Sequence, residues 1–356
     1  MNNSKPDSIK KFIDIDDLDV DFFHTTNDIS NIDREWGENI IFQYYRKYGF
    51  PHYKINENEK KEHFHQLQKF DESSIFKDDK IDQTMHCLRL CWSYFPHHWE
   101  VGCSNSKSPM EAFNDDKILK KVIKKTWDWV LKHSDNKKFT ENRLRQNLKV
   151  YGASQSVSNF RPTAAKWIYN NYGNGGVVWD MSMGWGGRML GFLTSDCKVY
   201  IGTEPATQTF SGLMEMATDF SHIKKNVMLY RMGSEMYEPQ NESLDLCFTS
   251  PPYFDTERYS DEDTQSYKKY GTKDEWLNGF LRKTFQNCWY GLKENGYMLI
   301  NIANTPKHKW IEENTKEIAV DIGFEYEKTI HLILSSIAGN GQKLEPIFMF
   351  KKIKKT

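Results

Sequence analysis

Two consecutive prolines after an apolar run constrain how this chain can fold. Residues 244–248 predict a buried strand, and Ser250, Pro251, Pro252 and Tyr253 follow one residue later. Proline has no N–H group and a fixed φ, so the pair prevents further ladder pairing and an immediate helix. A rigid turn must therefore stand at the carboxyl end of a strand. In an open α/β sheet, that edge is where ligands bind.

The turn presents a hydroxyl, a fixed carbonyl and an aromatic ring together. The Ser250 hydroxyl and the Pro251 carbonyl can accept hydrogen bonds from the exocyclic amine of a base. The Tyr253 ring can stack on that base. Such a set suits methyl transfer to the amine, in which rate comes from positioning and electrostatics without a covalent intermediate. A proline-rich surface turn or a phosphorylatable Ser-Pro site has the same sequence.

A glycine-rich segment upstream predicts a nucleotide-type cofactor site. Residues 177–193 read as a short strand, Asp180, a turn and a helix. Gly184, Gly186 and Gly187 permit positive φ and close approach of the backbone to a ligand at the helix N-terminus. By itself, this loop is equally compatible with a nicotinamide cofactor.

An acidic residue follows the next predicted strand. Residues 199–202 are apolar and end in Thr203 and Glu204. A carboxylate at the tip of the second strand can accept hydrogen bonds from ribose hydroxyls. A solvated loop charge or a carboxylate at the entry of the next helix is the alternative interpretation of Glu204.

The sequence Thr-Ser-Pro-Pro-Tyr at 249–253 resembles the catalytic motif of the S-adenosylmethionine-dependent DNA amino-methyltransferases, the N4-cytosine and N6-adenine family. The version that begins with serine is found mostly in the cytosine-N4 members. The resemblance implies S-adenosyl-L-methionine as cofactor. The residues that it implies as catalytic are Ser250, Pro251, Pro252 and Tyr253.

Other segments resemble further motifs of this family. Asp180 and its glycines are similar to the motif Asp-Pro-x-x-Gly-x-Gly, with Met181 in place of proline. Residues 158–172 resemble the motif that covers the methionine end of the cofactor, and 233–235 the motif that flanks its adenine. Phe160 is equally compatible with a core aromatic, and 233–235 with an ordinary loop. The cofactor-binding residues implied are Asn159, Phe160, Arg161, Asp180, Gly184, Gly186, Gly187, Glu204, Ser234 and Glu235.

Hydrophobic periodicity downstream predicts a continuing α/β sheet. The expected elements are helices at 276–292 and 310–322 and strands at 297–302, 324–334 and 346–350, with a turn at Gly339-Asn340-Gly341 before the last strand. The resemblance covers about residues 150–352. It implies a Rossmann-like methyltransferase sheet, mostly parallel with an antiparallel edge hairpin, together with a mainly helical N-terminal region.

Three regions are expected along the chain. Residues 1–30 form a flexible acidic lead-in, 31–150 a mainly helical region that could recognise DNA, and 151–356 the methyltransferase catalytic domain. The insert 254–272 is predicted to be a mobile lid over a flipped base. A helix at 115–132 has lysines that could contact phosphates or form a solvated face. Its expected apolar stripe is Ile118, Val122, Thr126, Trp129 and Val130.

Bulk composition restricts the functional classes without selecting one. The chain has 356 residues, 38% hydrophobic content and a net charge of −1, so any DNA contact must come from local patches. No stretch approaches membrane-spanning length and no signal-like start is present, so we expect a soluble cytoplasmic protein without a membrane partner. No cysteine follows a proline, which argues against the Pro-Cys nucleophile of the cytosine-C5 enzymes.

Cysteines and histidines between 86 and 103 suggest a zinc site or ordinary core packing. The cluster lacks a compact Cys-x-x-Cys pair, so no metal is expected. Its members are His86, Cys87, Cys91, His97, His98 and Cys103.

The sequence therefore predicts an enzyme that transfers a methyl group from S-adenosyl-L-methionine to the exocyclic amine of a flipped base in duplex DNA, with cytosine N4 the preferred target. Adenine N6, an RNA base and a protein glutamine are alternative targets. A catalytically inactive DNA-binding relative is the non-enzyme alternative. A cognate restriction nuclease is a conceivable partner. This prediction requires the double-proline turn and the glycine-rich loop to share one edge of the sheet.

Overall fold

The computed structural model describes residues 28–82, 84–103, 106–337 and 341–353, which divide into two compact units. Unit 1 holds the described parts of 28–52 and 99–157, and unit 2 those of 53–98 and 158–353. Residues 53–98 thus group with the sheet, although the sequence placed them in the N-terminal region. The predicted lead-in lies outside the described residues up to position 27, and Ile29 already belongs to a 3-10 turn, η1 (Ile29–Asn31).

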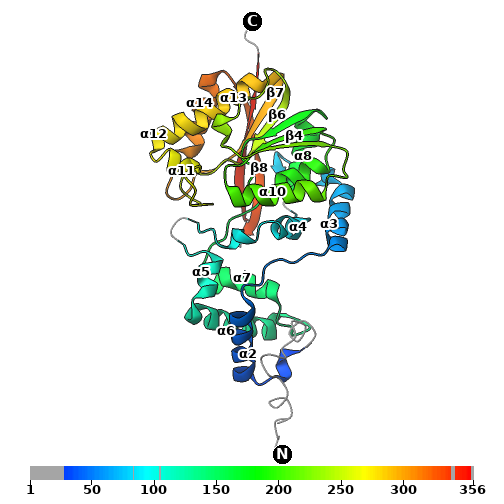
Figure 1. Ribbon diagram of the computed structural model, residues 1–356, viewed down its shortest axis with the longest axis vertical. Helices are drawn as coiled ribbons and strands as arrows, with labels where there is room; N and C mark the ends of the chain where they lie inside the picture. Colours follow the sequence, from blue (N-terminus) through cyan, green and yellow to red (C-terminus); the bar gives the residue numbers. More distant parts are fainter. Residues whose placement is uncertain (1–27, 83, 104–105, 338–340, 354–356) are drawn as a thin grey trace, which may run out of the picture. The chain divides into compact units, whose positions relative to one another are not determined.

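Unit 1 is helical, as predicted (Figure 1). Side chains that precede the helices accept hydrogen bonds from the first free N–H groups, for example Asp33 from Trp36 and Thr140 from Arg143. None of the helices in the described part of the chain is long and apolar enough to cross a membrane. The helices are α2 (Arg34–Tyr48), α5 (Pro109–Asn114), α6 (Asp116–His133) and α7 (Glu141–Tyr151).

The apolar face of α6 is rotated relative to the predicted stripe. Three predicted members are buried, whereas Ile118 and Trp129 are only half-buried. Adjacent apolar residues at 119, 123 and 127 allow two overlapping stripes, and packing against the other helices selects between them. The buried residues are Leu119, Val122, Ile123, Thr126, Trp127 and Val130.

Unit 2 contains a nine-stranded sheet in the order β1-β2-β8-β9-β7-β6-β3-β4-β5. The strands from β7 to β5 are parallel, and β9 runs antiparallel to both β7 and β8. The predicted Rossmann-like α/β class with an antiparallel hairpin is confirmed, and the short strands β1 and β2 extend the hairpin side. Most of the predicted turn at Gly339-Asn340-Gly341 lies outside the described residues. The strands are β1 (Phe76–Lys77), β2 (Lys80–Ile81), β3 (Val177–Asp180), β4 (Val199–Thr203), β5 (Asn226–Tyr230), β6 (Leu244–Thr249), β7 (Leu292–Asn301), β8 (Glu325–Ile337) and β9 (Gly341–Lys351).

Helices alternate with these strands, as parallel pairing requires. The predicted helix at 276–292 begins with a π-helical turn, η5, before it becomes α-helical. The helices of unit 2 are α3 (Glu57–Lys69), α4 (Leu88–Ser93), α8 (Pro162–Tyr172), α9 (Gly187–Leu193), α10 (Thr207–Asp219), α11 (Ser266–Lys269), α12 (Lys273–Glu275), η5 (Trp276–Arg282), α13 (Lys283–Gly291) and α14 (Ile311–Ile322).

The central parallel strands β3, β4 and β6 are buried on both faces, to which their side chains point alternately. Trp179 and Cys247 point to the side covered by η5, α13 and α14, and they belong to the core on that side. Phe248 points to the other side, where its ring lies edge-on to Tyr169 of α8, with 5.7 Å between ring centroids. The sheet is therefore a rigid platform whose two edges carry the loops.

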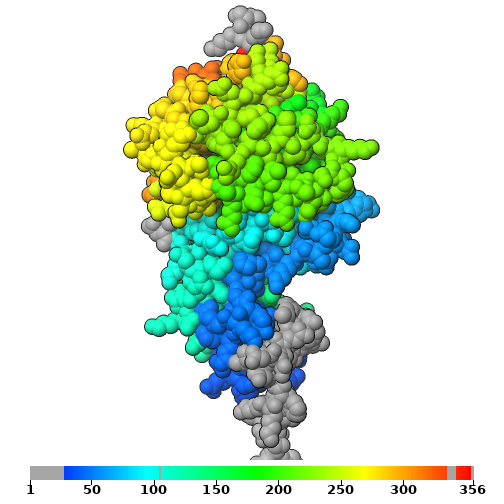
Figure 2. Space-filling model, viewed as in Figure 1, coloured from blue at the N-terminus to red at the C-terminus, as the bar shows by residue number. Residues whose placement is uncertain are grey.

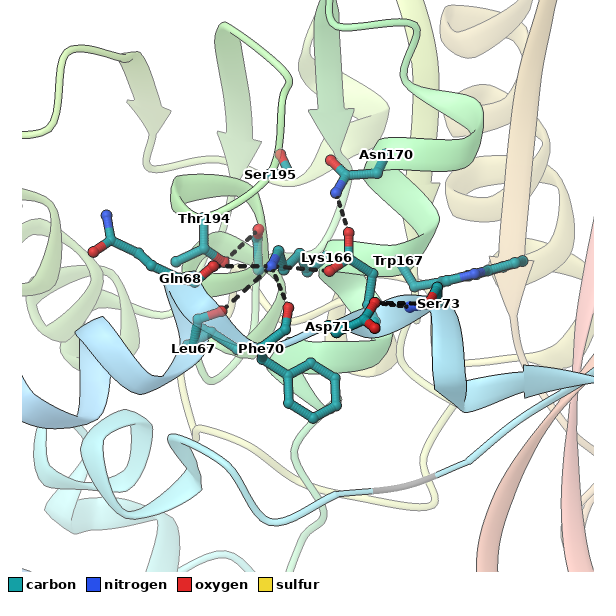
Figure 3. Close-up of polar contacts among 12 residues, drawn as sticks. Leu67, Gln68, Phe70, Asp71, Ser73, Lys166, Trp167, Asn170, Thr194 and Ser195 are labelled. Carbon is teal, nitrogen blue, oxygen red and sulfur yellow. Dashed lines mark hydrogen bonds and ion pairs between the residues drawn. The ribbon is translucent and has the colours of Figure 1, made fainter.

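Lys166 of α8 fixes the segment 67–72 to this platform (Figure 3). Its ammonium donates to the carbonyls of Phe70 at 2.7 Å, Gln68 at 3.2 Å and Leu67 at 3.4 Å, at the carboxyl end of α3. It also pairs with Glu72 at 2.9 Å. A cation at a helix C-terminus is favourable, and here it satisfies carbonyls that the helix itself leaves free.

Replacing Lys166 with methionine should destabilise unit 2 by about 3 kcal/mol, because the three carbonyls and the Glu72 carboxylate lose their common, buried partner. Urea unfolding monitored by circular dichroism measures this loss. Lys198→Met, at an exposed lysine, is the matched control and should be nearly neutral. Equal stability of the two variants would contradict the anchoring role of Lys166.

Candidate functional site

The structure brings the double-proline turn and the glycine-rich loop to one edge of the sheet. Strands β3 and β6 are parallel neighbours, so their carboxyl ends meet at the same edge. The Thr249 hydroxyl, one residue before Ser250, donates to Asp180 at 2.8 Å. The Ser182 N–H donates back to the Thr249 oxygen at 3.0 Å. The two segments are thus joined directly at their bases.

Asp180 is fully buried, and protein groups surround its carboxylate. Its Oδ2 accepts hydrogen bonds from Arg188 Nε and from the Tyr200 hydroxyl, each at 2.8 Å. Burial opposes the charge of Arg188, yet the adjacent Asp180 carboxylate raises the pKa of this guanidinium. Arg188 also donates to the carbonyl of Ser182. Asp180 therefore fixes the shape of the loop from below.

The three predicted glycines have different physical roles. Gly184 and Gly186 have φ values of +54° and +72°, which side chains rarely adopt. A Cβ on Gly186 would also lie 2.6 Å from Met216 Cε. A Cβ on Gly187 would lie 2.0 Å from the Phe160 carbonyl oxygen. Substitution of Gly186 or Gly187 would consequently displace protein neighbours, whereas Gly184 has open space around it.

Glu204 joins the loop to the end of β4. One carboxylate oxygen accepts the Gly184 N–H at 3.1 Å, and the other accepts the Ala206 N–H at 3.0 Å. Glu204 is only 8% exposed, and this burial raises the pKa of its carboxyl group to about 7. An acid poised near neutrality at the tip of the second strand is typical of a functional site.

The segment 159–161 lies against the same loop. The Asn159 side chain donates to the carbonyl of Trp185 at 2.9 Å. Phe160 is buried edge-on to Phe248, with 5.2 Å between ring centroids, so its core-aromatic interpretation describes the packing observed. Arg161 occupies the position before α8, and burial lowers the pKa of its guanidinium.

Ser234 and Glu235 follow β5 in a 3-10 turn, η4 (Ser234–Met236). Both are buried, and the Ser234 hydroxyl is 2.8 Å from the Thr284 hydroxyl of α13. Glu235 accepts a hydrogen bond from Lys269 at 2.7 Å. Because β5 is parallel to β4, these residues stand at the same edge as Glu204.

The predicted catalytic turn is fixed by a polar network. The Tyr253 hydroxyl donates to Glu345 of β9 at 2.9 Å, and the Asn301 side chain donates to the other Glu345 oxygen at 3.3 Å. Burial and the neighbouring Glu345 carboxylate raise the pKa of Tyr253 well above its usual value. Phe254, directly after the turn, has a φ of +55°, which is strained for a side-chain-bearing residue.

An aromatic cluster that the sequence did not reveal supports the glycine-rich loop. The ring of Trp185 lies 5.8 Å from Phe95 and 5.2 Å from His97 between centroids. Burial lowers the pKa of His97 to about 4, so its imidazole is neutral at pH 7. In the part of the chain that the structure describes, no three metal-ligating side chains group together. Of the histidines considered for zinc, His97 and His98 pack against Trp185, whereas His86 packs against Phe70.

The raised pKa of Glu204 makes stability depend on pH. The folded carboxyl keeps a proton up to about pH 7 that the unfolded chain releases near pH 4.5. This stabilisation is fully present below pH 4.5 and is lost as the pH rises through 7, an effect of roughly 3 kcal/mol at most. Relative to Glu204→Gln, the free energy of unfolding of the wild type should therefore fall over this range. Urea unfolding of both proteins at several pH values would disprove this if their difference stayed constant.

Comparison with known proteins gives partial matches. No protein-family model matches the chain. A type II methyltransferase of Methanocaldococcus jannaschii, M.MjaVI, is 35% identical over 94 residues, which make up 25% of this chain and 45% of that protein. The chain therefore spans less than half the length of this curated relative.

Two solved structures resemble the chain at low identity. A SAM-dependent O-methyltransferase of Thermotoga maritima is 12% identical, and the match has a TM-score of 0.36. The matched region covers 56% of this chain and 68% of the Thermotoga chain. A SAM-dependent methyltransferase of Methanosarcina mazei is 12% identical, covers 53% and 98%, and has a TM-score of 0.37. The fold class follows from the order and direction of the strands in the sheet.

Proposed function

We propose that this chain is an S-adenosyl-L-methionine-dependent DNA amino-methyltransferase that acts on a flipped base, with cytosine N4 as its target. The observation that carries the proposal is the direct linkage of the Ser250 turn to the glycine-rich loop through Thr249 and Asp180. The partial identity to a protein named as a type II methyltransferase supports it.

The cofactor would lie along the carboxyl ends of β3, β4 and β5. When bound, S-adenosyl-L-methionine supplies an electrophilic sulfonium methyl group. Residues 185–187 would hold it through backbone N–H groups, and Glu204 would accept hydrogen bonds from the ribose hydroxyls, while Ser234 and Glu235 would flank the adenine. The Gly184 and Ala206 N–H groups that donate to Glu204 orient its carboxyl group at the tip of β4, where the ribose would lie. Asn159 and Arg161 would face the methionine end.

The base would lie against the double-proline turn. The Ser250 hydroxyl and the Pro251 carbonyl would accept hydrogen bonds from the exocyclic amine and orient its lone pair towards the methyl group. The Tyr253 ring would stack on the base. Because Glu345 holds the Tyr253 hydroxyl, the orientation of the ring is fixed before the base arrives.

Incubation of duplex DNA with the protein and cofactor should yield N4-methylcytosine, detected by mass spectrometry of the released nucleosides. Tyr253→Ala should lower turnover roughly 10- to 100-fold, the effect of losing one aromatic stack. Tyr253→Phe keeps the ring and should stay within several-fold of the wild type. Calorimetry should show nearly unchanged cofactor affinity for both variants.

Each other outcome has a distinct meaning. N6-methyladenine would reassign the target base, and the absence of both products would favour an RNA base or a protein glutamine. A wild-type protein that binds no cofactor would favour an inactive DNA-binding relative. Normal turnover by Tyr253→Ala would exclude the stacking role.

We propose that unit 1 contacts the phosphate backbone of DNA. Residues 116–151, which include α6 and α7, contain eleven Lys and Arg against four Asp and Glu, in a chain whose net charge is −1. At 3.6 residues per turn, five exposed lysines of α6 fall within an arc of about 100° and a length of about 22 Å. Duplex DNA carries one charge per about 1.7 Å of axis, so several phosphates lie within that length. In the part of the chain that the structure describes, none of these five lysines forms an ion pair with an acidic side chain. They are Lys117, Lys121, Lys124, Lys125 and Lys132.

The double variant Lys121→Ala/Lys125→Ala should bind DNA less tightly and with a weaker salt dependence. The slope of log K against log salt should fall by about 1.8, since each lost phosphate contact contributes about 0.9. Lys198→Ala/Lys224→Ala removes the same charge from exposed positions before β4 and β5 and should keep the wild-type slope. Equal slopes for the two variants in fluorescence-anisotropy titrations would show that these lysines of α6 do not contact DNA.

A further inference from the structure

The insert 254–272 crosses the carboxyl edge of the sheet from one side to the other. It begins beside the loop after β7, where Asp255 pairs with His308 at 2.5 Å. The ring of Tyr259 then lies 6.0 Å from Trp185, in the loop after β3. These contacts lead the insert away from the double-proline turn and towards the glycine-rich loop.

Two further contacts continue this path. The backbone N–H and the hydroxyl of Thr207, at the start of α10, donate to the Glu262 carboxylate at 2.8 and 2.7 Å. Lys269 then pairs with Glu235, after β5, at 2.7 Å. The insert therefore meets the loops after β7, β3, β4 and β5 in the order in which these strands stand in the sheet. In the space-filling view, the yellow insert borders the green part of the surface (Figure 2).

Gln265 lies between these two contacts and is only 5% exposed. Its amide nitrogen is buried and donates no hydrogen bond to any group that the structure describes. Buried amide donors nearly always have partners, so this side chain is short of an acceptor. Thr264, the preceding residue, donates to the Pro205 carbonyl at 3.4 Å, which places the Gln265 backbone next to the residue that follows Glu204.

We propose that the insert is a strap that closes over the nucleoside end of the bound cofactor, and that Gln265 donates a hydrogen bond to an acceptor on that nucleoside. This inference rests on the proposed function. The strap differs from the lid over a flipped base that the sequence suggested, because Tyr259, Glu262 and Lys269 contact the loops after β3, β4 and β5. Two of its contacts with the cofactor-side loops, Glu262 with Thr207 and Lys269 with Glu235, are called latches.

The latches are few and partly exposed, so the strap can open without disturbing the sheet. Glu262 is half-buried, and Lys269 is exposed where it reaches the buried Glu235. Hydrogen bonds to Thr207 and Ser260 hold the pKa of Glu262 below its usual value despite partial burial, so this latch is ionised at neutral pH. Release of the cofactor would then require the latches to break first, which makes their strength a control on the rate of exchange.

Stopped-flow displacement of S-adenosyl-L-homocysteine from the full-length protein tests the latch. Glu262→Ala should raise the dissociation rate constant about tenfold. Asp263→Ala is the matched control. The Asp263 side chain is fully exposed, and its ion-pair partner Lys268 is 3.8 Å away, which makes a weak contact. This variant removes the same charge and should change the rate less than twofold. Equal rates for the two variants would overturn the strap while leaving the proposed function intact.

Gln265→Leu tests the ligand contact separately. It preserves the size of the side chain and removes its donors, so affinity for S-adenosyl-L-homocysteine should fall about tenfold in calorimetry. The melting temperature of the ligand-free protein should not fall, because the lost donor had no protein partner. A lower melting temperature with unchanged affinity would show a purely structural role and overturn the assignment. A wild-type protein that fails to bind the ligand would instead refute the proposed function itself.

Discussion

The buried pairing of Asp180 with Arg188 is the interaction on which the candidate site depends. A carboxylate and a guanidinium away from water are costly unless their remaining hydrogen-bonding positions are filled. Here the Tyr200 and Thr249 hydroxyls fill those of Asp180, and the Ser182 carbonyl fills one of Arg188. Because these partners come from β3, β4, β6 and α9, one cluster sets the positions of the glycine-rich loop and the double-proline turn together.

Above this cluster, the functional groups are arranged as layers of increasing exposure. The anchoring charges are buried in the sheet, Glu204 and Glu235 stand at its edge, and the insert lies across them. This arrangement separates rigidity from motion, since only the outermost layer is held by a few polar contacts. Opening of the insert would therefore leave the double-proline turn in place.

Much of the fold could be predicted from local patterns. Strands β4 and β6 and helix α14 begin and end within one or two residues of the expected positions, because apolar runs and glycine or proline breaks are local. The predictions that differed depend on distant neighbours. The rotation of α6 was decided by helix packing, and residues 53–98 joined unit 2 through contacts such as that of Lys166 with Phe70, which no local pattern encodes.

The sequence by itself determined where the chain must turn and which chemical groups it presents there. Two prolines after β6 exclude further pairing, and glycines after β3 allow the positive φ that the loop adopts. Only the tertiary structure decided which groups meet. The packing of His97 on Trp185, the raised pKa of Glu204 and the path of the insert arise from side chains far apart in sequence. Their energies depend on burial and distance, which exist only once the sheet has brought its strand ends together.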